Sequence, residues 1–250
     1  MNRRELQVKA LRERTVGLHE PLIAERVRLI SEAYERASQV SAIATLVEHP
    51  PTASGDYRVW SVSEARPADQ FNDKTFHWET YCGQIGRLVA RAEEHEIFRK
   101  VMSAADNRNA VSSFGELRSA VDQAVAELAG YSTPPLLILP VKLSVPGIFS
   151  DGLVFDRQTA DNVVTPHGQV RVIWTGEESI DNALLYHPDA VDWHVKLEPE
   201  TGNRLRVAIG TQSADPGSVL FLAETVARCD PPAIGTALAI GIGIDLSKEL

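Results

Sequence analysis

The chain has 250 residues, of which 44% are hydrophobic and 24% charged, and its formal net charge is -9. This composition is typical of a globular protein and excludes a disordered or fibrous chain. The negative charge argues against a general affinity for nucleic-acid phosphates, although residues 1–14 are locally basic. The two cysteines, Cys82 and Cys229, stand far apart without a partner motif. We therefore expect no disulfide, no zinc site and no membrane span, and a cytoplasmic location.

Residues 21–47 predict one long N-terminal helix, because apolar side chains recur there at helical spacing between charged ones. Pro21 suits the first turn of such a helix, and Pro50 and Pro51 lie just beyond its end. The sequence does not indicate what this helix packs against.

Residues 50–77 are polar and rich in turn residues, apart from one short alternating run of Tyr57, Val59, Trp60 and Val62. Loops of this length are uncommon inside compact domains. We interpret the segment as an extended hairpin arm that adds little to the core of its own subunit, whereas a floppy linker explains the composition equally well. If it is an arm, deletion of residues 51–72 should leave the body of the subunit folded.

Two further helices are predicted in the middle of the chain. Residues 79–104 carry an apolar stripe that includes Leu88, and residues 114–128 repeat apolar side chains at spacings of three and four. We expect Leu88 and Leu128 to be buried, so that replacement of either by alanine costs about 2–5 kcal/mol.

The second half of the chain is dominated by strand signals. Strands are predicted where short apolar runs lie between turn residues, namely over residues 136–141, 170–174, 183–186, 193–197, 204–210, 218–228 and 233–244. The last of these runs is almost wholly apolar, so that strand should be buried on both faces. Between the first two strands, residues 157–164 are interpreted as a short helix.

The motifs of common enzymes are absent from this sequence. It has no phosphate-binding glycine loop, no GxSxG and no HExxH. The residues that look most catalytic are Glu93, Glu94, His95 and Glu96, all within one predicted helix. A di-iron site needs Glu-x-x-His pairs on several helices, and the sequence offers no such repeat. We therefore interpret these four residues as a solvated or subunit-contacting face.

The cysteines and the other histidines give no clear site either. Cys82 and His77 could imitate a Cys/His pair, but no orienting group or oxyanion donor stands near them. Both cysteines are expected to be buried and structural. The remaining scattered histidines are interpreted as ordinary turn residues: His19, His49, His167, His187 and His194. The sequence thus predicts no catalytic residue, no cofactor and no metal site.

The segments between residues 79 and 244 follow a recognisable order. A helix ending in AEEHEIF is followed by a helix AVDQAVAELAG that leads into LLILPV, and then by VRVIWTGEESIDNALLYHPDAVDWHVKL, RLRVAIG and VLFLAETVARCDPPAIGTALAIG. This order resembles that of the encapsulins, bacterial shell proteins with the tailed-phage major capsid fold. The positions that carry the resemblance are Glu93, Ile97, Phe98, Ile180, Ala183, Leu184, Leu185, Asp192, Trp193, Ala208, Ile209, Gly210, Glu224 and Thr225. Before residue 79 the glycine-arginine and V-V-D-V patterns of the encapsulin arm are missing, and a longer helix replaces them.

The resemblance implies an α+β, tailed-phage major-capsid-like fold with an N-terminal helical arm, an extended loop, a long spine helix and a mixed β-sheet lobe. The implied divisions are the arm over residues 1–50, the loop over 51–78, a peripheral domain over 79–130 and 211–230, and an axial domain over 131–210 and 231–250. In this family an extended arm reaches over a neighbouring subunit. Tyr57, Val59, Trp60 and Val62 would then be inter-subunit contacts.

The implied function is that of a self-assembling, non-enzymatic subunit, many copies of which form an icosahedral shell. An encapsulin-like shell would enclose a cargo protein in the cytoplasm, whereas a phage or prophage capsid would enclose DNA in a virion. Two other functions stay open. One is a cytosolic oligomeric enzyme with an inter-subunit site that uses Glu93, His95 or Cys82. The other is an adaptor that holds a partner with the helix over residues 21–47.

The resemblance also implies a pore loop, with Phe149, Ser150, Asp151 and Gly152 near a symmetry axis. A ring of Asp151 carboxylates would line the opening, so Asp151→Lys should change the passage of small ions without disturbing assembly. An ordinary surface turn, in which the aspartate only favours the turn backbone, explains the same residues.

Overall fold

The computed structural model describes residues 3–15, 17–128, 133–143, 162–176, 181–211 and 215–244. The chain divides into two compact units. The first unit contains Met1–Ser41, Leu46–Glu94 and Trp193–Arg228, and the second contains Ala42–Thr45, His95–Asp192 and Cys229–Leu250. This division differs from the expected domains, because residues 95–128 fall in the second unit and residues 193–210 in the first. Among the described residues, no helix has the length and apolar character needed to cross a membrane.

The N-terminal region contains more elements than the single predicted helix. These are α1 (Arg3–Arg12), α2 (Glu20–Ala37), the short α3 (Val40–Ile43) and strand β1 (Thr45–His49). Helix α2 ends where Ser38 adopts an extended conformation and donates its backbone N–H to the carbonyl of Tyr34. The prediction of one helix over residues 21–47 was therefore wrong after Ala37. The apolar spacing continues there, but the backbone turns into α3 and then into a strand.

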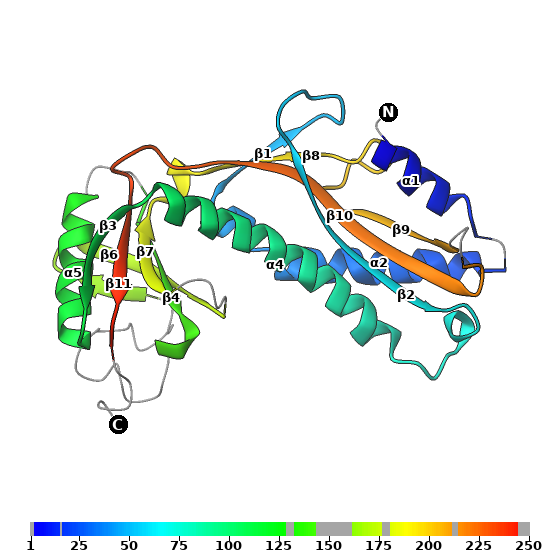
Figure 1. Cartoon of the computed structure of the whole chain (residues 1–250), viewed down its shortest axis with the longest axis horizontal. Helices are drawn as coiled ribbons and strands as arrows, with labels where there is room; N and C mark the ends of the chain where they lie inside the picture. Colours follow the sequence, from blue (N-terminus) through cyan, green and yellow to red (C-terminus); the bar gives the residue numbers. More distant parts are fainter. Residues whose placement is uncertain are drawn as a thin grey trace. The chain divides into compact units, whose positions relative to one another are not determined.

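The first unit contains a five-stranded sheet (Figure 1). Its strands run in the order β1, β8 (Asp192–Lys196), β10 (Ser218–Asp230) and β2 (Arg58–Pro67), and β9 (Arg206–Thr211) pairs with β10 as well. Strand β10 is antiparallel to both β2 and β9. Strand β10 has 13 residues, so it can pair with several strands along its length. It is therefore the central strand of this sheet.

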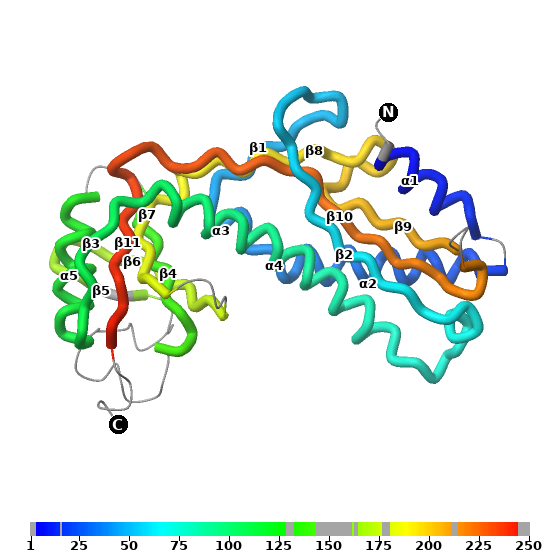
Figure 2. The backbone as a smooth tube through the Cα atoms, viewed as in Figure 1, coloured from blue at the N-terminus to red at the C-terminus, as the bar shows by residue number. Residues whose placement is uncertain are grey.

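The two faces of this sheet carry different layers. Along β10 the side chains of Val219, Phe221 and Ala223 belong to a buried cluster with α2 and α4 (Trp78–Ala104), whereas Leu220 and Leu222 pack against α1. This division follows from the alternation of side chains along a strand. Helices α2 and α4 thus cover one face, and α1 lies on the other. The tube in Figure 2 shows α1 and α2 on different sides of β9.

The second unit is built on a six-stranded mixed sheet in the order β3-β11-β7-β4-β6-β5. Its strands are β3 (Asp106–Val111), β4 (Leu136–Pro140), β5 (Asn162–Thr165), β6 (Gly168–Thr175), β7 (Asn182–Tyr186) and β11 (Ala237–Ile242). Strand β11 is parallel to β3 and antiparallel to β7. Helix α5 (Phe114–Glu127) packs its apolar face on this sheet, with Leu117 and Val121 fully buried against the strands.

The described residues test several local predictions. Leu128 is 3% exposed, as expected, but Leu88 is 46% exposed, so its predicted burial was wrong. The buried side of α4 passes through Ile85 and Val89 instead, which leaves Leu88 on the solvent side. Residues 162–164, expected to end a short helix, belong instead to β5 (Asn162–Thr165), which pairs antiparallel with β6. The rest of that expected helix, residues 157–161, lies outside the described residues.

Candidate assembly surfaces

The expected arm is part of its own subunit's sheet. Strand β2 pairs with β10 of the same chain from Arg58 opposite Ala227 to Pro67 opposite Ser218. After β2, the short 3-10 helix η1 (Gln70–Asn72) carries Phe71, which is 0% exposed. The expectation that this segment adds little to its own core was therefore wrong. Deletion of residues 51–72 would remove both a strand and a core aromatic residue.

Phe71 lies in an aromatic cluster that anchors this segment in the core of the first unit. Its ring centroid is 5.9 Å from that of Trp78 and 6.1 Å from that of Phe221. The guanidinium of Arg26 lies over the rings of Phe71 and Trp78, at 4.1 and 3.9 Å from their centroids, and donates a hydrogen bond to the Phe71 carbonyl. This cation–π contact joins α2, η1 and the start of α4. Burial lowers the pKa of Arg26.

Three of the predicted arm residues have identifiable neighbours in the first unit. Trp60 packs near Trp193, with ring centroids 5.5 Å apart, and Val62 packs against the core beneath α4. Tyr57 precedes β2 and has Lys196 and Arg228 over its ring, at 4.5 and 5.5 Å from the centroid. Like these three, Val59 is half-buried.

Strand β2 forms one end of the strand order in its sheet, and most of its side chains are exposed. An edge strand has one row of backbone N–H and C=O groups that no strand of its own sheet can use. Ten residues make a long edge. Most of the segment predicted to contact a neighbour therefore lies in an edge strand of its own subunit's sheet.

Two histidines that were interpreted as turn residues form a pair instead. His49 ends β1 and His194 lies in β8, and the Nε2 atom of His49 is 2.8 Å from the Nδ1 atom of His194. One ring must donate and the other accept in this hydrogen bond. His187 does lie at a turn, because its carbonyl accepts the Ala190 N–H, but its side chain is buried: it is 2% exposed and its Nε2 atom lies 3.0 Å from the Leu128 carbonyl.

The candidate catalytic cluster on α4 is not a solvated face. Glu93 is 0% exposed and accepts a hydrogen bond of 2.7 Å from the hydroxyl of Tyr34 on α2. Burial raises the pKa of Glu93 to about 7, although the hydrogen bond from Tyr34 acts in the opposite direction. Glu96 is 6% exposed and pairs with Arg99 at 2.8 Å. The interpretation of Glu93 and Glu96 as solvated was therefore wrong.

The two cysteines are free and buried, which confirms their predicted burial. Burial raises the pKa of both Cys82 and Cys229 to about 12. At neutral pH both thiols are therefore protonated, and a protonated thiol is a poor nucleophile. Within the described ranges, no three His, Cys, Asp or Glu side chains are grouped so that they could hold a metal ion. The candidate pore residues Phe149, Ser150, Asp151 and Gly152 lie outside the described residues.

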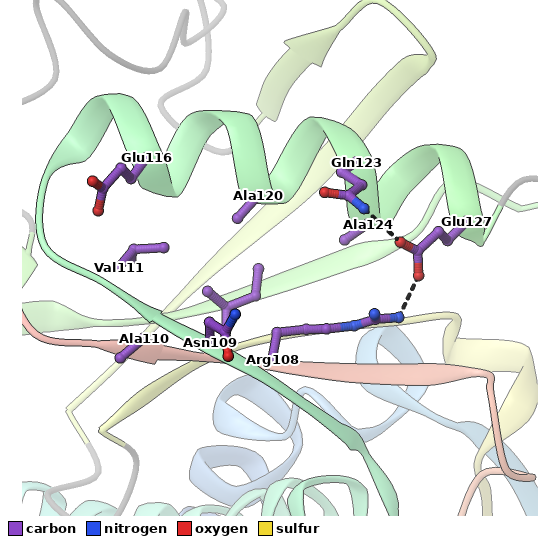
Figure 3. Close-up of a pocket in the computed structure, with 10 residues that line it drawn as sticks. Arg108, Asn109, Ala110, Val111, Glu116, Ala120, Gln123, Ala124 and Glu127 are labelled. Carbon is purple, nitrogen blue, oxygen red and sulfur yellow. Dashed lines mark hydrogen bonds and ion pairs between the residues drawn. The ribbon is translucent and has the colours of Figure 1, made fainter.

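The second unit contains a groove that the sequence did not indicate (Figure 3). It has a volume of about 430 Å³ and lies between β3 and α5. Its walls include Arg108, which pairs with Glu127, and Glu116, which accepts hydrogen bonds from the backbone N–H and the hydroxyl of Ser112. Strand β3 was missed because its sequence, DNRNAV, has no apolar alternation. In this region the local sequence signal was the serine that caps the next helix, α5.

Comparison with known proteins gives relatives by structure alone. No protein-family model matches the chain, and no curated protein matches it in sequence. A virus-like particle protein from Pyrococcus furiosus superposes with a TM-score of 0.60 and 13% identity, over 85% of this chain and 96% of that one. A capsid protein of a gene transfer agent particle gives 0.55 and 15%, over 82% and 90%. An encapsulin from Synechococcus elongatus gives 0.53 and 8%, over 81% and 86%.

These likenesses extend over most of both chains in each pair, so they are not limited to one sheet or one helix. At such low sequence identity, these structural likenesses are evidence for the fold alone. The predicted α+β capsid-like fold is thus confirmed, and this chain has the fold that encapsulins share with the capsid proteins of phages and gene transfer agents.

Proposed function

We propose that this chain is the subunit of a closed icosahedral shell that assembles from many copies of itself and acts as a container. The observation that carries this proposal is the near-complete structural match to a virus-like particle protein, over 85% of this chain and 96% of the other. A match to a single domain would leave the remaining residues free for another task. Here most of the chain is used by the shared fold.

The arm segment supports assembly through strand pairing. Strand β2 is one edge of its sheet, and a long exposed edge is an aggregation hazard unless something covers it. Symmetric assembly removes the hazard, because each copy supplies the cover for the next. Under this proposal the stretch from Tyr57 to Val62 contacts a neighbouring subunit while it stays anchored in its own sheet.

The enzyme alternative is less well supported by the residues that suggested it. Glu93 is fully enclosed and bonded to Tyr34, and Cys82 is 0% exposed with a raised thiol pKa. Neither side chain is open to a substrate in the subunit. We therefore propose a structural role without catalysis for this chain.

What the shell encloses is the finer part of the proposal. We favour a protein cargo, as in an encapsulin-like compartment in the cytoplasm, and keep DNA in a phage-type capsid as the second candidate. The chain's net charge of -9 favours the first, because a shell that packs DNA benefits from cationic groups near the phosphates.

The contents of purified particles test this choice. Particles made in the native host should contain a second protein that mass spectrometry detects at a fixed ratio to the shell subunit. They should also have the ultraviolet absorbance spectrum of protein, unchanged by nuclease treatment after opening. Particles filled with host or phage DNA of uniform length would support the capsid alternative and overturn the cargo proposal.

A further inference from the structure

Strand β2 carries two charges of opposite sign, placed symmetrically about Ser61. Arg58 and Glu64 are both exposed, and within the described part of the chain neither side chain makes an ion pair or a hydrogen bond. Side chains alternate along a strand, so these two lie on one face. They are about 20 Å apart along the strand, because each residue advances it by about 3.3 Å. Arg58 and Glu64 of one chain therefore cannot pair with each other.

Two half-buried apolar side chains lie between these charges on the same face. Val62 packs against the cluster beneath α2 and α4, and the ring centroid of Trp60 lies 5.5 Å from that of Trp193. Ser61 points to the other face, where its hydroxyl accepts a hydrogen bond of 2.7 Å from Arg4 of α1. The face shared by the two charges thus has an apolar centre and ends of opposite charge.

This pattern is complementary to itself when it is reversed. If two copies of β2 run antiparallel with Ser61 opposite Ser61, Arg58 of each copy comes opposite Glu64 of the other. In the same register Trp60 comes opposite Val62. Oppositely charged and apolar side chains stabilise an antiparallel pair when they lie directly opposite each other. A twofold axis repeats each of these contacts, so both ends of the strand are matched.

The neighbouring registers lack this match. If the centre moves by one residue from Ser61, one shift places Arg58 of one copy opposite Arg66 of the other. The opposite shift places Glu64 opposite Asp56, which precedes the strand. Like charges directly opposite each other are destabilising. The charges of this segment therefore favour the register that is centred on Ser61.

The backbone of β2 can form such a pair. Strand β2 ends the strand order of its sheet and runs along β10 on one side (Figure 1), so its other side is an edge to which a further strand can bond. We infer that β2 pairs antiparallel with β2 of a second copy of this chain, around a twofold axis at Ser61, through Arg58–Glu64 contacts between the copies. This inference rests on the proposed shell function, to which it adds the partner and the register of the arm contact. Icosahedral symmetry includes twofold axes, so a contact of this kind has a place in a closed shell.

Disulfide trapping tests the register. In the proposed pair the two Ser61 Cα atoms are about 4.5–5.5 Å apart, which a disulfide can span. Ser63→Cys is the matched control, because Ser63 is also exposed and on the same face, but its two copies would be about 13 Å apart. The chain's own cysteines are buried, so the unaltered chain gives the baseline. Mild oxidation of purified Ser61→Cys protein should give a covalent dimer on a non-reducing gel, and Ser63→Cys should give about tenfold less.

Charge reversal tests the Arg58–Glu64 contact. In the Ser61→Cys chain, Arg58→Glu should reduce the disulfide dimer and the yield of closed particles several-fold, because two carboxylates then oppose each other. Glu64→Arg should do the same. The double variant should restore both, since the pairs form again with their signs exchanged. Both side chains are exposed, so all three variants should keep the wild-type circular dichroism spectrum. Restoration has to come from contacts between copies, because the two residues are too far apart within one chain.

The outcomes separate this inference from the proposed function. If the wild type forms closed particles, but Ser61→Cys gives no more dimer than Ser63→Cys and the double variant restores nothing, the inference is wrong and the proposed function stands. A dimer that forms preferentially through Ser63→Cys would also contradict the inference. If Ser61→Cys is trapped as a dimer while the wild type forms no larger particle, the contact exists and the proposed function fails.

Discussion

The buried carboxyl of Glu93 shows how one residue of α4 depends on distant parts of the chain. Its carboxyl accepts a hydrogen bond from Tyr34, 59 residues earlier, and Thr225 and Trp193 also bear on its pKa. The positive charge of Arg204 lowers the pKa of Glu93, but burial raises this pKa by more. The result is a carboxyl group that keeps its proton close to neutral pH.

Glu93 should make the stability of the subunit depend on pH. The pKa of this carboxyl rises from an ordinary value of 4.5 to about 7 on folding, so the unfolded chain ionises first as pH increases. Stability is fully present below pH 4.5 and is lost as pH rises through 7, by roughly 3 kcal/mol in total. Glu93→Gln keeps a side-chain oxygen that can accept the hydrogen bond from Tyr34, but it removes the group that titrates. Urea unfolding at pH 5 and pH 8 should show a smaller loss in the variant than in the wild type.

The difference between wild type and variant isolates Glu93 from all other titrating groups. Equal pH dependence in the two proteins would mean that Glu93 titrates alike in the folded and unfolded states, contrary to its observed burial. Both proteins should be compared at one concentration, because assembly itself adds to apparent stability.

Gly86 sets the distance between α2 and α4. A Cβ atom at this position would lie 2.3 Å from the Ile30 carbonyl oxygen and 2.7 Å from the Tyr34 nitrogen, both backbone atoms of α2. Gly86→Ala must therefore push the helices apart, and we expect a loss of about 1–3 kcal/mol in the free energy of unfolding.

Gly83, in the same helix, is the matched control for Gly86. A Cβ atom there meets only the end of the Arg87 side chain, at 3.2 Å, which can move away. Gly83→Ala should stabilise the subunit by up to about 1 kcal/mol, because alanine is the better helix former. Urea unfolding, monitored by tryptophan fluorescence, measures the change in stability of both variants. The account of the helix contact fails if the two variants change stability in the same direction by similar amounts.

At the scale of elements, α1 is fixed to the sheet by two arginines and one close approach. Arg4 pairs with Glu224, which is 1% exposed, and Arg12 pairs with Glu198, which is 4% exposed. At Gly210 of β9 a Cβ atom would lie 2.0 Å from the Leu11 carbonyl oxygen. Helix α1 therefore needs glycine at this point to lie flat on the strand.

Gly210→Ala should detach α1 while the rest of the first unit stays folded. Limited trypsin digestion should then cut after Arg12 or Arg14 several times faster than in the wild type, because a released segment is open to the protease. Gly176→Ala is the control, since nothing lies within 4 Å of a Cβ atom there. Unchanged cleavage of the Gly210 variant, with the wild-type circular dichroism spectrum, would show that α1 does not depend on this contact.

Sequence patterns predicted the elements whose signals are local. The strands over residues 136–140, 218–230 and 237–242 and the serine-capped helix α5 were found, because apolar runs, turn residues and caps mark them directly. Strands β1 and β3 were missed. Helical spacing runs on into β1, and β3 is a polar edge strand whose order comes from pairing with β11, more than 120 residues later.

The surfaces were harder to predict than the elements. Leu88 fits the helical stripe as well as Ile85 does, and only the position of α2 decides which of them is buried. The charged run around Glu93 looked solvated because its partner lies on another helix. The groove beside β3 is lined by residues of two elements, β3 and α5, and no local sequence pattern marks it.

At the scale of the whole molecule, the resemblance in segment order predicted the fold better than any single motif. Sequence identity to the structural relatives is only 8–15%, so the shared fold is not apparent from residue identities. The boundaries of the two units were harder to predict. Helix α4 and strand β10 each contribute residues to both units, so no linker or composition change marks the division.

The particle size of the purified protein tests the central claim most directly. A single 27.4 kDa chain that forms an icosahedral shell should elute as particles of megadalton mass, since at least sixty copies are needed for such symmetry. Light scattering should give a narrow mass distribution, and negative-stain electron microscopy should show closed, uniform, hollow particles. A stable monomer or small oligomer at micromolar concentration, under conditions that span pH 5 to 8 and low to high salt, would contradict the proposal that this chain builds a shell.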